Sequence, residues 1–282
     1  MPRRHPDWVK VRAPGSPNYL RLKRILRDHS LHSVCEEARC PNIAECWENH
    51  TATFLILGDI CTRGCRFCAI SKGRPGLLDP EEPRNVGLVV KELGLEHIVV
   101  TSVDRDDLLD GGSAHFAKTV FWIKLLNPGI RVEVLIPDFK GDHKALETVV
   151  QSGVQILNHN METVPRLYKK VRPGSVYQRS LDILKTAKEI RENVLTKSGL
   201  MLGVGETTGE VMGTLQDLRE INCDIVTLGQ YLQPSTDQLA VERYVSPAEF
   251  QELKTEAQKL GFRHVESGPL VRSSYHAWSH VH

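Results

Sequence analysis

The chain has 282 residues, of which 40% are hydrophobic, and this is enough for one large globular domain or two small ones. Lysine and arginine number 36 against 35 aspartate and glutamate, so the bulk charge predicts no binding to nucleic acid or to an anionic membrane. The longest apolar runs are far shorter than the roughly 20 residues that span a bilayer, so no transmembrane helix is expected.

Residues 1–52 fit no β–α unit and are predicted to form an N-terminal extension. Its start is basic, but prolines interrupt it and no apolar core follows, which argues against a secretory signal. The basic residues are Arg3, Arg4, Lys10 and Arg12. We therefore expect a cytoplasmic protein.

From Thr53 onward, β-branched runs alternate with helical patterns, as is typical of β–α units around a parallel sheet. The predicted strands are Thr53–Leu57, His97–Thr101, Arg131–Leu135, Val154–Leu157, Ser198–Leu202 and Ile225–Leu228, with a shorter seventh candidate at His264–Glu266. The predicted helices are Val86–Leu93, Ala114–Leu126, Lys144–Gln151, Ser180–Arg191, Glu210–Glu220 and Pro247–Leu260.

Six such units predict an α/β fold, a partial (β/α)6 barrel of the TIM type, although periodicity alone also allows an open doubly wound sheet. The barrel is expected over residues 53–267, followed by a C-terminal tail over 268–282. In both folds, active sites collect in the loops that follow the strands. Those loops are polar or reactive here: Cys61–Cys68, Ser102–Asp107, Pro137–Asp138, Asn158–Glu162, Gly203–Glu206 and Gln230–Gln233.

Seven cysteines are present, and six of them fall between Cys35 and Cys68. In a cytoplasmic chain of this length, dense cysteines indicate metal binding or catalysis more than disulfides, and the odd count argues against complete pairing. Cys223 stands alone before a predicted core strand, and we expect it to be a buried, dispensable hydrophobic residue.

The pattern Cys61-x3-Cys65-x2-Cys68 offers three thiolates, which leaves one iron of a four-iron cluster without a protein ligand. Structural zinc usually takes four ligands, so zinc is disfavoured. With Phe67 before its last cysteine, the pattern resembles the signature of the radical S-adenosylmethionine superfamily. The resemblance implies that S-adenosylmethionine chelates the open iron and is cleaved to a 5′-deoxyadenosyl radical.

Downstream residues resemble the superfamily in part. Gly199–Glu206 looks like its adenine-contact motif, with Met201 where a branched aliphatic residue is more usual, while Thr101 and Ser102 occupy the place of a Gly-Gly-Glu motif. The glycines also fit ordinary turns at a strand end.

Other polar loop residues are candidates for contacts with the same cofactor or with the substrate. Asn160 and Glu162 are predicted ribose contacts, and Arg172 is a predicted carboxylate partner, although it borders Lys169 and Lys170 in what is commonly a solvated face. Gln230 or Tyr231 is a candidate substrate contact. His159 and His276 are expected to be structural.

A second triplet, Cys35-x4-Cys40-x5-Cys46, occurs together with Arg272–Ala277 near the C-terminus. This pair of motifs resembles the lipoyl synthase family. The similarity extends over nearly the whole chain, including Arg105–Gly112, Asn158–Thr163, Lys197–Gly203 and Gln230–Ser235. It implies a second, auxiliary 4Fe-4S cluster held by the three cysteines and by Ser274, a residue that otherwise fits an ordinary turn.

The resemblance implies radical insertion of two sulfur atoms at C6 and C8 of an octanoyl group bound to a carrier protein, with S-adenosylmethionine as oxidant and the auxiliary cluster as sulfur donor. The implied partners are an octanoylated lipoyl carrier domain or H protein, an electron donor such as flavodoxin or ferredoxin, and an iron–sulfur carrier that rebuilds the consumed cluster. The alternatives are another radical sulfur-inserting enzyme, methylthiolating or biotin-forming, and a non-enzymatic electron carrier or zinc-stabilised binding protein.

Overall fold

The structure is a computed structural model and describes residues 6–11, 13–48 and 53–274. Outside these ranges lie Tyr275, His276 and Ala277 of the C-terminal motif, and the basic residues Arg3, Arg4 and Arg12. No helix in the described ranges is long and apolar enough to cross a membrane.

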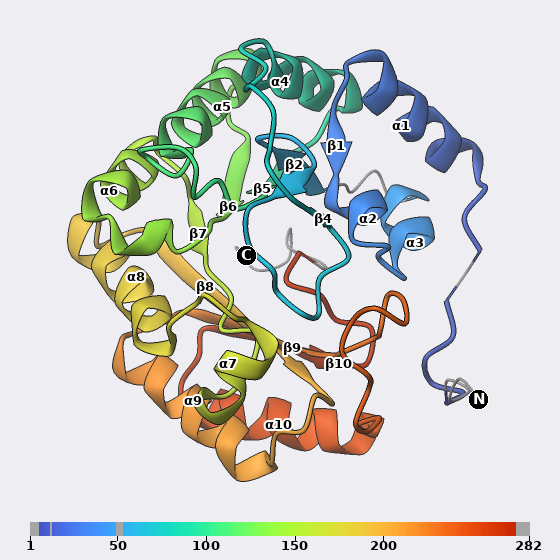
Figure 1. The fold of residues 1–282 in the computed structure, drawn as a ribbon, viewed down its shortest axis with the longest axis vertical. Helices are drawn as coiled ribbons and strands as arrows, with labels where there is room; N and C mark the ends of the chain where they lie inside the picture. Colours follow the sequence, from blue (N-terminus) through green and yellow to red (C-terminus); the bar gives the residue numbers. More distant parts are fainter. Residues whose placement is uncertain (1–5, 12, 49–52, 275–282) are drawn as a thin grey trace.

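One curved sheet forms the centre of the molecule, with helices around its outside (Figure 1). Its eight strands follow the order β1-β2-β5-β6-β7-β8-β9-β10, and each neighbouring pair from β2 to β10 is parallel. The predicted partial barrel is therefore confirmed. The parallel strands are β2 (Thr53–Ile56), β5 (His97–Ser102), β6 (Arg131–Leu135), β7 (Ile156–Asn158), β8 (Leu195–Leu202), β9 (Ile225–Gln230) and β10 (His264–Gly268).

The six predicted helices are all present, and most begin earlier than predicted. They are α4 (Glu82–Leu93), α5 (Ser113–Leu126), α6 (His143–Gln151), α8 (Tyr177–Ile190), α9 (Thr208–Glu220) and α10 (Pro247–Lys259). Capping boxes start α9 at Thr207 and α10 at Ser246. A short helix, α7 (Tyr168–Val171), and two 3-10 turns, η1 (Phe139–Gly141) and η2 (Pro165–Leu167), lie in loops after strands.

The N-terminal extension is part of the same core. Its first helix, α1 (Pro17–Asp28), begins at the Ser16 cap and buries Leu22, Ile25 and Leu26. A two-residue strand, β1 (His32–Ser33), then pairs antiparallel with β2, which the sequence pattern does not predict. Two short helices follow, α2 (Val34–Glu37) and α3 (Ile43–Glu48).

The barrel interior contains a buried ion pair. The ammonium of Lys197 on β8 lies 2.8 Å from the Glu133 carboxylate on β6, and both side chains are fully buried. Burial alone raises the pKa of Glu133, but Lys197 and the neighbouring His97 outweigh it and lower that pKa to about 2. Because each charge has a partner, the pair leaves no isolated charge inside the barrel.

Candidate active site

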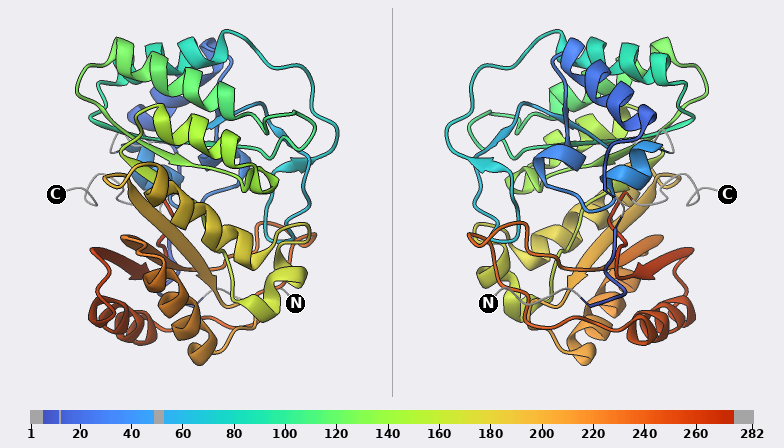
Figure 2. Two further views of the ribbon diagram at one scale, coloured as in Figure 1. Left: turned by 90° about the vertical axis from the view of Figure 1, so that its left-hand side faces the viewer. Right: turned by 90° about the vertical axis from the view of Figure 1, so that its right-hand side faces the viewer.

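The triplet of Cys61, Cys65 and Cys68 lies in a loop over the ends of the barrel strands. Cys61 ends β3 (Ile60–Cys61), which pairs with β4 (Ser71–Lys72) in a separate two-stranded sheet (Figure 2). Cys61, Cys65 and Cys68 are all half-buried. Burial, first of all, raises the pKa of Cys61 to about 11 and that of Cys68 to about 12, and the neighbouring thiols raise both further. The three thiols therefore lie near enough for their charges to influence one another.

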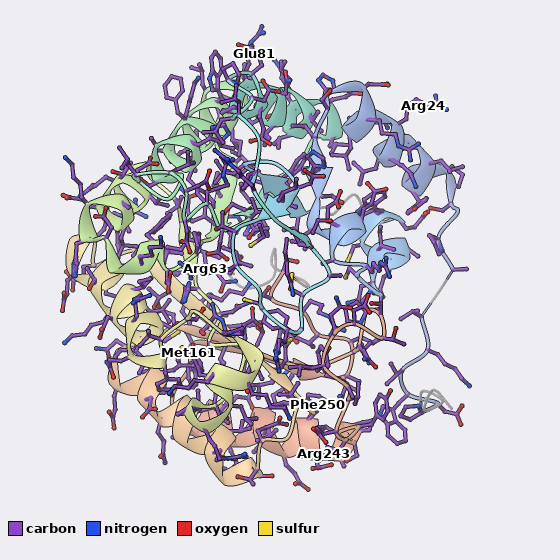
Figure 3. The ribbon with its side chains drawn as sticks, in the orientation of Figure 1. Arg24, Arg63, Glu81, Met161, Arg243 and Phe250 are labelled. Atoms are coloured by element: carbon purple, nitrogen blue, oxygen red, sulfur yellow. The ribbon has the colours of Figure 1, made fainter. Side chains whose placement is uncertain are left out.

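Arg63 anchors this loop to the barrel. Its guanidinium donates two hydrogen bonds of 2.8 Å to Asp106 and lies 2.5 Å from Asp138, which also pairs with Arg179 at 3.1 Å. Figure 3 shows Arg63 toward the centre of the ring of strands. Burial alone raises the pKa of Asp138, but Arg63 lowers it to about 2. The Asp138 carboxylate thus stays ionised, and the contacts of Arg63 with Asp106 and Asp138 keep the cysteine loop fixed to the loops after β5 and β6.

Thr101 and Ser102 end β5, on the side of the sheet where the cysteine loop lies. The hydroxyl of Thr101 donates to the Leu135 carbonyl at 2.9 Å and is therefore occupied. The hydroxyl of Ser102 is buried and has no hydrogen-bond partner among the described residues. A buried polar atom without a partner is costly unless a ligand satisfies it, so Ser102 suits a contact with a bound cofactor.

Asn160, Glu162 and Arg172 lie together after β7. Asn160 donates to Glu162 at 2.9 Å, and its own side-chain oxygen is buried without a partner in the described part of the chain. Arg172 donates to the Asn160 carbonyl at 2.6 Å and lies over the Tyr168 ring, 5.5 Å from its centroid. One end of its guanidinium donates to the carbonyls of Asn160 and Met161, so Arg172 helps to hold the conformation of this loop. It is also a cation near Cys65.

The predicted adenine-contact segment follows β8. Met201 is half-buried on that strand, and Glu206 accepts hydrogen bonds from the backbone N–H groups of Gly203 and Val204 at 2.6 and 3.0 Å. At Gly203, where φ is +99°, a Cβ atom would lie 2.4 Å from the Arg243 carbonyl. These contacts show that the turn is tightly packed. Gly199 and Met201 are two residues apart on β8, so they face the same side of the sheet.

The triplet of Cys35, Cys40 and Cys46 lies in the N-terminal extension, against the core. Cys35 is buried, whereas Cys40 and Cys46 are half-buried, and burial raises the pKa of all three thiols. The thiols of Cys35 and Cys40 both raise the pKa of Cys46 further, so they are close. The indole N–H of the fully buried Trp47 has no hydrogen-bond partner among the described residues, yet it lowers the pKa of Cys35. A bound group with sulfur acceptors would satisfy it.

The C-terminal segment reaches this triplet from β10. Asn42, which lies between Cys40 and Cys46, donates to the Leu270 carbonyl at 2.6 Å. Gly229 on β9 makes the approach possible, because a Cβ there would lie 2.1 Å from the Val271 carbonyl oxygen. The Arg272 guanidinium follows and lowers the pKa of the Cys40 thiol. Ser274, two residues further, is half-buried in a turn.

Among the described residues, no group of three or more His, Cys, Asp or Glu side chains is arranged to hold one metal ion. A four-iron cluster imposes a different arrangement, since each cysteine binds a separate iron atom and the sulfur atoms lie farther apart. The donor set of each triplet, three soft thiols in partly buried loops, fits such a cluster.

Sequence reasoning gave Arg63 no role. It singled out Pro137–Asp138 and Arg272–Ala277, but it did not predict that Asp138 pairs with Arg63 or that Arg272 lies near Cys40, because these partners are distant in the chain. It also singled out residues with structural roles. The Gln230 amide donates to three carbonyls, including that of Leu202, and the Tyr231 hydroxyl donates to the Leu239 carbonyl. His159 is buried between the Ile136 carbonyl and the Ser180 hydroxyl, and Cys223 is fully buried.

Comparisons with known proteins agree with this arrangement. Residues 55–218 match the family model of the radical SAM superfamily, and residues 2–40 match that of the N-terminal domain of lipoyl synthase of the radical SAM family. The lipoyl synthase of Rubrobacter xylanophilus is 56% identical over 96% of this chain and 85% of its own length. That of Roseiflexus sp. is 53% identical over 99% and 92%, and that of Caldanaerobacter subterraneus 54% identical over 97% and 96%.

Solved structures share the fold at low identity. Methylornithine synthase (PylB) aligns with a TM-score of 0.57 at 17% identity and covers 88% of this chain and 81% of its own. Streptococcus suis SuiB bound to S-adenosylmethionine aligns with a TM-score of 0.60 at 12% identity and covers 91% and 64%.

Proposed function

Because the chain belongs to the lipoyl synthase family, a family of radical S-adenosylmethionine enzymes, we propose how its own residues divide the work of that reaction. The enzyme inserts two sulfur atoms, at C6 and C8, into an octanoyl group carried by a protein. Its superfamily membership implies a 4Fe-4S cluster and S-adenosylmethionine.

Cys61, Cys65 and Cys68 are the proposed ligands of this cluster. The support is that all three thiols lie in one loop at the strand ends and interact with one another. Arg63 would hold the loop in a fixed position through Asp106 and Asp138. When bound, the cluster would supply the electron that cleaves S-adenosylmethionine.

The cofactor itself would lie beside this loop, against residues from three strand ends. The unpartnered oxygens of Ser102 and Asn160 favour direct contacts with its polar groups, and Glu162 beside Asn160 suits the hydroxyls of a ribose. Arg172 would contribute positive charge for its carboxylate, Thr101 a backbone contact, and Met201 an apolar surface for its adenine.

Cys35, Cys40, Cys46 and Ser274 are the proposed ligands of the second, auxiliary 4Fe-4S cluster, which would supply the sulfur atoms. The single observation that supports it best is the hydrogen bond from Asn42 to the Leu270 carbonyl, because it joins the cysteine loop to the segment that ends in Ser274. A serine alkoxide can leave iron by protonation more readily than a soft thiolate, which suits a cluster that must come apart.

On this proposal the chain has three parts: an extension over residues 1–52 with the auxiliary cysteines, a barrel over 53–267 with the first cluster, and a tail over 268–282 with the serine ligand. The reaction also needs protein partners. Its substrate is an octanoylated lipoyl carrier domain or H protein. A flavodoxin or ferredoxin would reduce the first cluster, and an iron–sulfur carrier would rebuild the second.

The test compares Cys68→Ala with Cys46→Ala in protein purified without oxygen. We expect the wild type to contain about eight iron and eight sulfide ions per chain. Each variant should lose about half of them. Cys68→Ala should not cleave S-adenosylmethionine, whereas Cys46→Ala should still cleave it without making lipoyl product. Zinc without sulfide in the wild type, or full turnover by either variant, would overturn the assignment.

A further inference from the structure

We propose that Leu57, held in a left-handed backbone conformation by Glu82 and Arg105, is a positioning residue. It fixes the direction in which the chain leaves β2 and so orders the Cys61–Cys68 loop before a cluster binds. The proposal rests on the proposed function, since it takes the three cysteines of that loop as cluster ligands. It goes further by giving a role to residues outside the cysteine motif.

The backbone of Leu57 has an unfavourable conformation. Leu57 directly follows β2, and its φ is +70°. Left-handed backbone is sterically unfavourable for residues with a Cβ atom, and leucine tolerates it less well than asparagine or aspartate. Such a residue persists where its surroundings impose the conformation, commonly at functional sites. Gly58 comes next with a φ of +89°, so the chain changes direction shortly before Cys61.

Charged side chains hold both backbone polar groups of Leu57. Its N–H donates to the Glu82 carboxylate at 2.9 Å, and Arg105 donates to its carbonyl at 3.1 Å. Both hydrogen bonds are buried. Glu82 is the first residue of α4, whereas Arg105 lies in the loop after β5, so two distant segments meet at one residue. Hydrogen bonds to charged groups are stronger than neutral ones, and these two offset the backbone strain.

The two holding side chains are themselves fixed. The Glu82 carboxylate lies 2.6 Å from Nε2 of His115 on α5, and both side chains are buried. Arg105 also donates to Asp107 at 2.9 Å and to the Gly76 carbonyl at 3.1 Å. Figure 1 shows α4 and α5 side by side on the outside of the sheet. The conformation of Leu57 is therefore imposed from the helix layer and from the β5 loop at once.

The side chain of Leu57 is fixed as well. It is buried and packs against Gly112, the residue before α5, where an added Cβ atom would collide with its Cδ1. A change of backbone conformation at Leu57 would have to withdraw this side chain from its packing.

An ordered loop favours cluster assembly, because a site that is fixed beforehand loses less conformational entropy when its ligand binds. Arg63 fixes the middle of the loop through Asp106 and Asp138, and Leu57 fixes its start. The strain at Leu57 corresponds to a factor of roughly ten or more in population. Without Glu82 the residue should therefore leave the left-handed region in most molecules, and the thiols would lose their common position.

The experiment measures how fast the unloaded full chain assembles the first cluster from iron and sulfide without oxygen. Absorbance and the EPR signal of the reduced cluster follow the assembly. The parent chain is Cys46→Ala, which on the proposed function has no auxiliary cluster, and each variant carries this substitution too. Circular dichroism of the unloaded protein gives the folded fraction, and rates are expressed per folded chain.

The first comparison changes Leu57 itself at nearly constant volume. Leu57→Ile adds a β-branch, which left-handed backbone tolerates least, and should slow assembly about tenfold. Leu57→Met is unbranched and should stay within about twofold of the parent chain. Leu55→Ile is the matched control, because the same exchange falls in the extended β2, where a β-branch is favoured. It should also stay within about twofold.

The second comparison removes the acceptor of the Leu57 N–H. Glu82→Met should slow assembly about tenfold, whereas Glu82→Gln keeps an acceptor oxygen and should restore the parent rate. Glycine adopts the left-handed conformation without strain. In a chain that also carries Leu57→Gly, the effect of Glu82→Met should therefore shrink to about threefold or less.

Equal rates for Leu57→Ile and the parent chain would overturn the proposal. An effect of Glu82→Met that is the same with and without Leu57→Gly would overturn it as well, as would losses that vanish when rates are expressed per folded chain. If Glu82→Met does not fold, the comparison of Leu57→Ile with Leu55→Ile decides alone. Failure of the proposed function is distinct, because the parent chain itself would then assemble no cluster.

Discussion

Arg63 lies inside the cysteine motif but binds no iron on our assignment. Its role is to hold the cysteine loop in position. Its bidentate contact with Asp106 and its ion pair with Asp138 require a planar guanidinium, which lysine lacks. We expect Arg63→Lys to lower the free energy of unfolding by about 3 kcal/mol, because it leaves a buried carboxylate with one partner fewer.

The same substitution should lower iron occupancy at Cys61, Cys65 and Cys68, while the triplet in the N-terminal extension keeps its iron. Thermal unfolding without oxygen and iron analysis measure both effects. Arg66→Lys, at the exposed arginine of the same loop, is the control and should change neither quantity. Full iron content in Arg63→Lys would show that the contacts of Arg63 with Asp106 and Asp138 are dispensable for cluster binding.

The lowered pKa of the buried His159 side chain predicts how the stability of the protein depends on pH. Burial first, and then the nearby Arg172, lowers the pKa of His159 from 6.5 to about 4, so the folded protein keeps this ring neutral. Between these two values the unfolded chain binds more protons than the folded one, and stability is therefore lost as the pH falls from 6.5 to 4. The His159 contribution to this loss is about 3 kcal/mol.

Unfolding of the wild type and of His159→Gln, measured at several pH values, tests this prediction. The variant should be less stable at pH 7, because glutamine does not reproduce both hydrogen bonds, but its stability should fall less between pH 6.5 and 4. Parallel curves for the two proteins would contradict the assignment of a neutral, buried His159.

At the scale of elements, the sequence predicts most of the barrel, because each strand and each helix has its own periodicity. The errors are at boundaries. β8 begins at Leu195, earlier than the predicted Ser198, because Lys197 is charged and yet paired inside the barrel with Glu133. α4 begins at Glu82, whose carboxylate accepts the backbone N–H of Leu57 at 2.9 Å. Both cases depend on partners that are distant in the chain.

The same limit applies to the candidate site. Cysteine spacing points to both triplets, since ligands of a cluster occur close together in the sequence. The contact between Asn42 and Leu270 joins residues 228 positions apart, and no local pattern indicates it. Neither does any pattern indicate that Arg63 binds Asp138. Motifs thus predict which groups react, while tertiary contacts decide how they are held.

A substitution at Gly229 tests how the C-terminal segment is positioned. A methyl group at this position would collide with the backbone at Val271, which cannot rotate away as a side chain can. We expect Gly229→Ala to displace residues 268–274 and so to remove iron from the auxiliary site, while S-adenosylmethionine cleavage at the first cluster persists. Iron analysis and the ratio of cofactor cleavage to lipoyl product measure this.

The control for Gly229→Ala is Gly213→Ala in α9, where a Cβ atom meets nothing within 4 Å. Alanine favours a helix over glycine by roughly 1 kcal/mol, so this variant should be as stable as the wild type or more so. If Gly229→Ala kept both clusters and full product formation, the close approach at Val271 would not determine the auxiliary site.

At the scale of the whole molecule, the extension and the barrel share one core. Leu22, Ile25 and Leu26 of α1 and the fully buried Trp47 belong to the same hydrophobic cluster as the barrel strands, and β1 covers the edge of β2. An uncovered strand edge with exposed apolar neighbours favours aggregation. On our proposal, the boundary at residue 52 separates two functional parts. The folding unit extends across this boundary.

This view predicts that a chain beginning at Thr53 does not fold by itself. Each large apolar side chain that loses its burial costs roughly 1.5–3 kcal/mol, and the total stability of a domain is only about 5–15 kcal/mol. A chain beginning at Ser16 is the control, because it keeps the cap of α1 and all four buried side chains. Circular dichroism should show cooperative thermal unfolding for the chain from Ser16 and none for the chain from Thr53. A cooperative transition at the wild-type temperature in the shorter chain would instead make the barrel an independent domain, with the extension docked onto it.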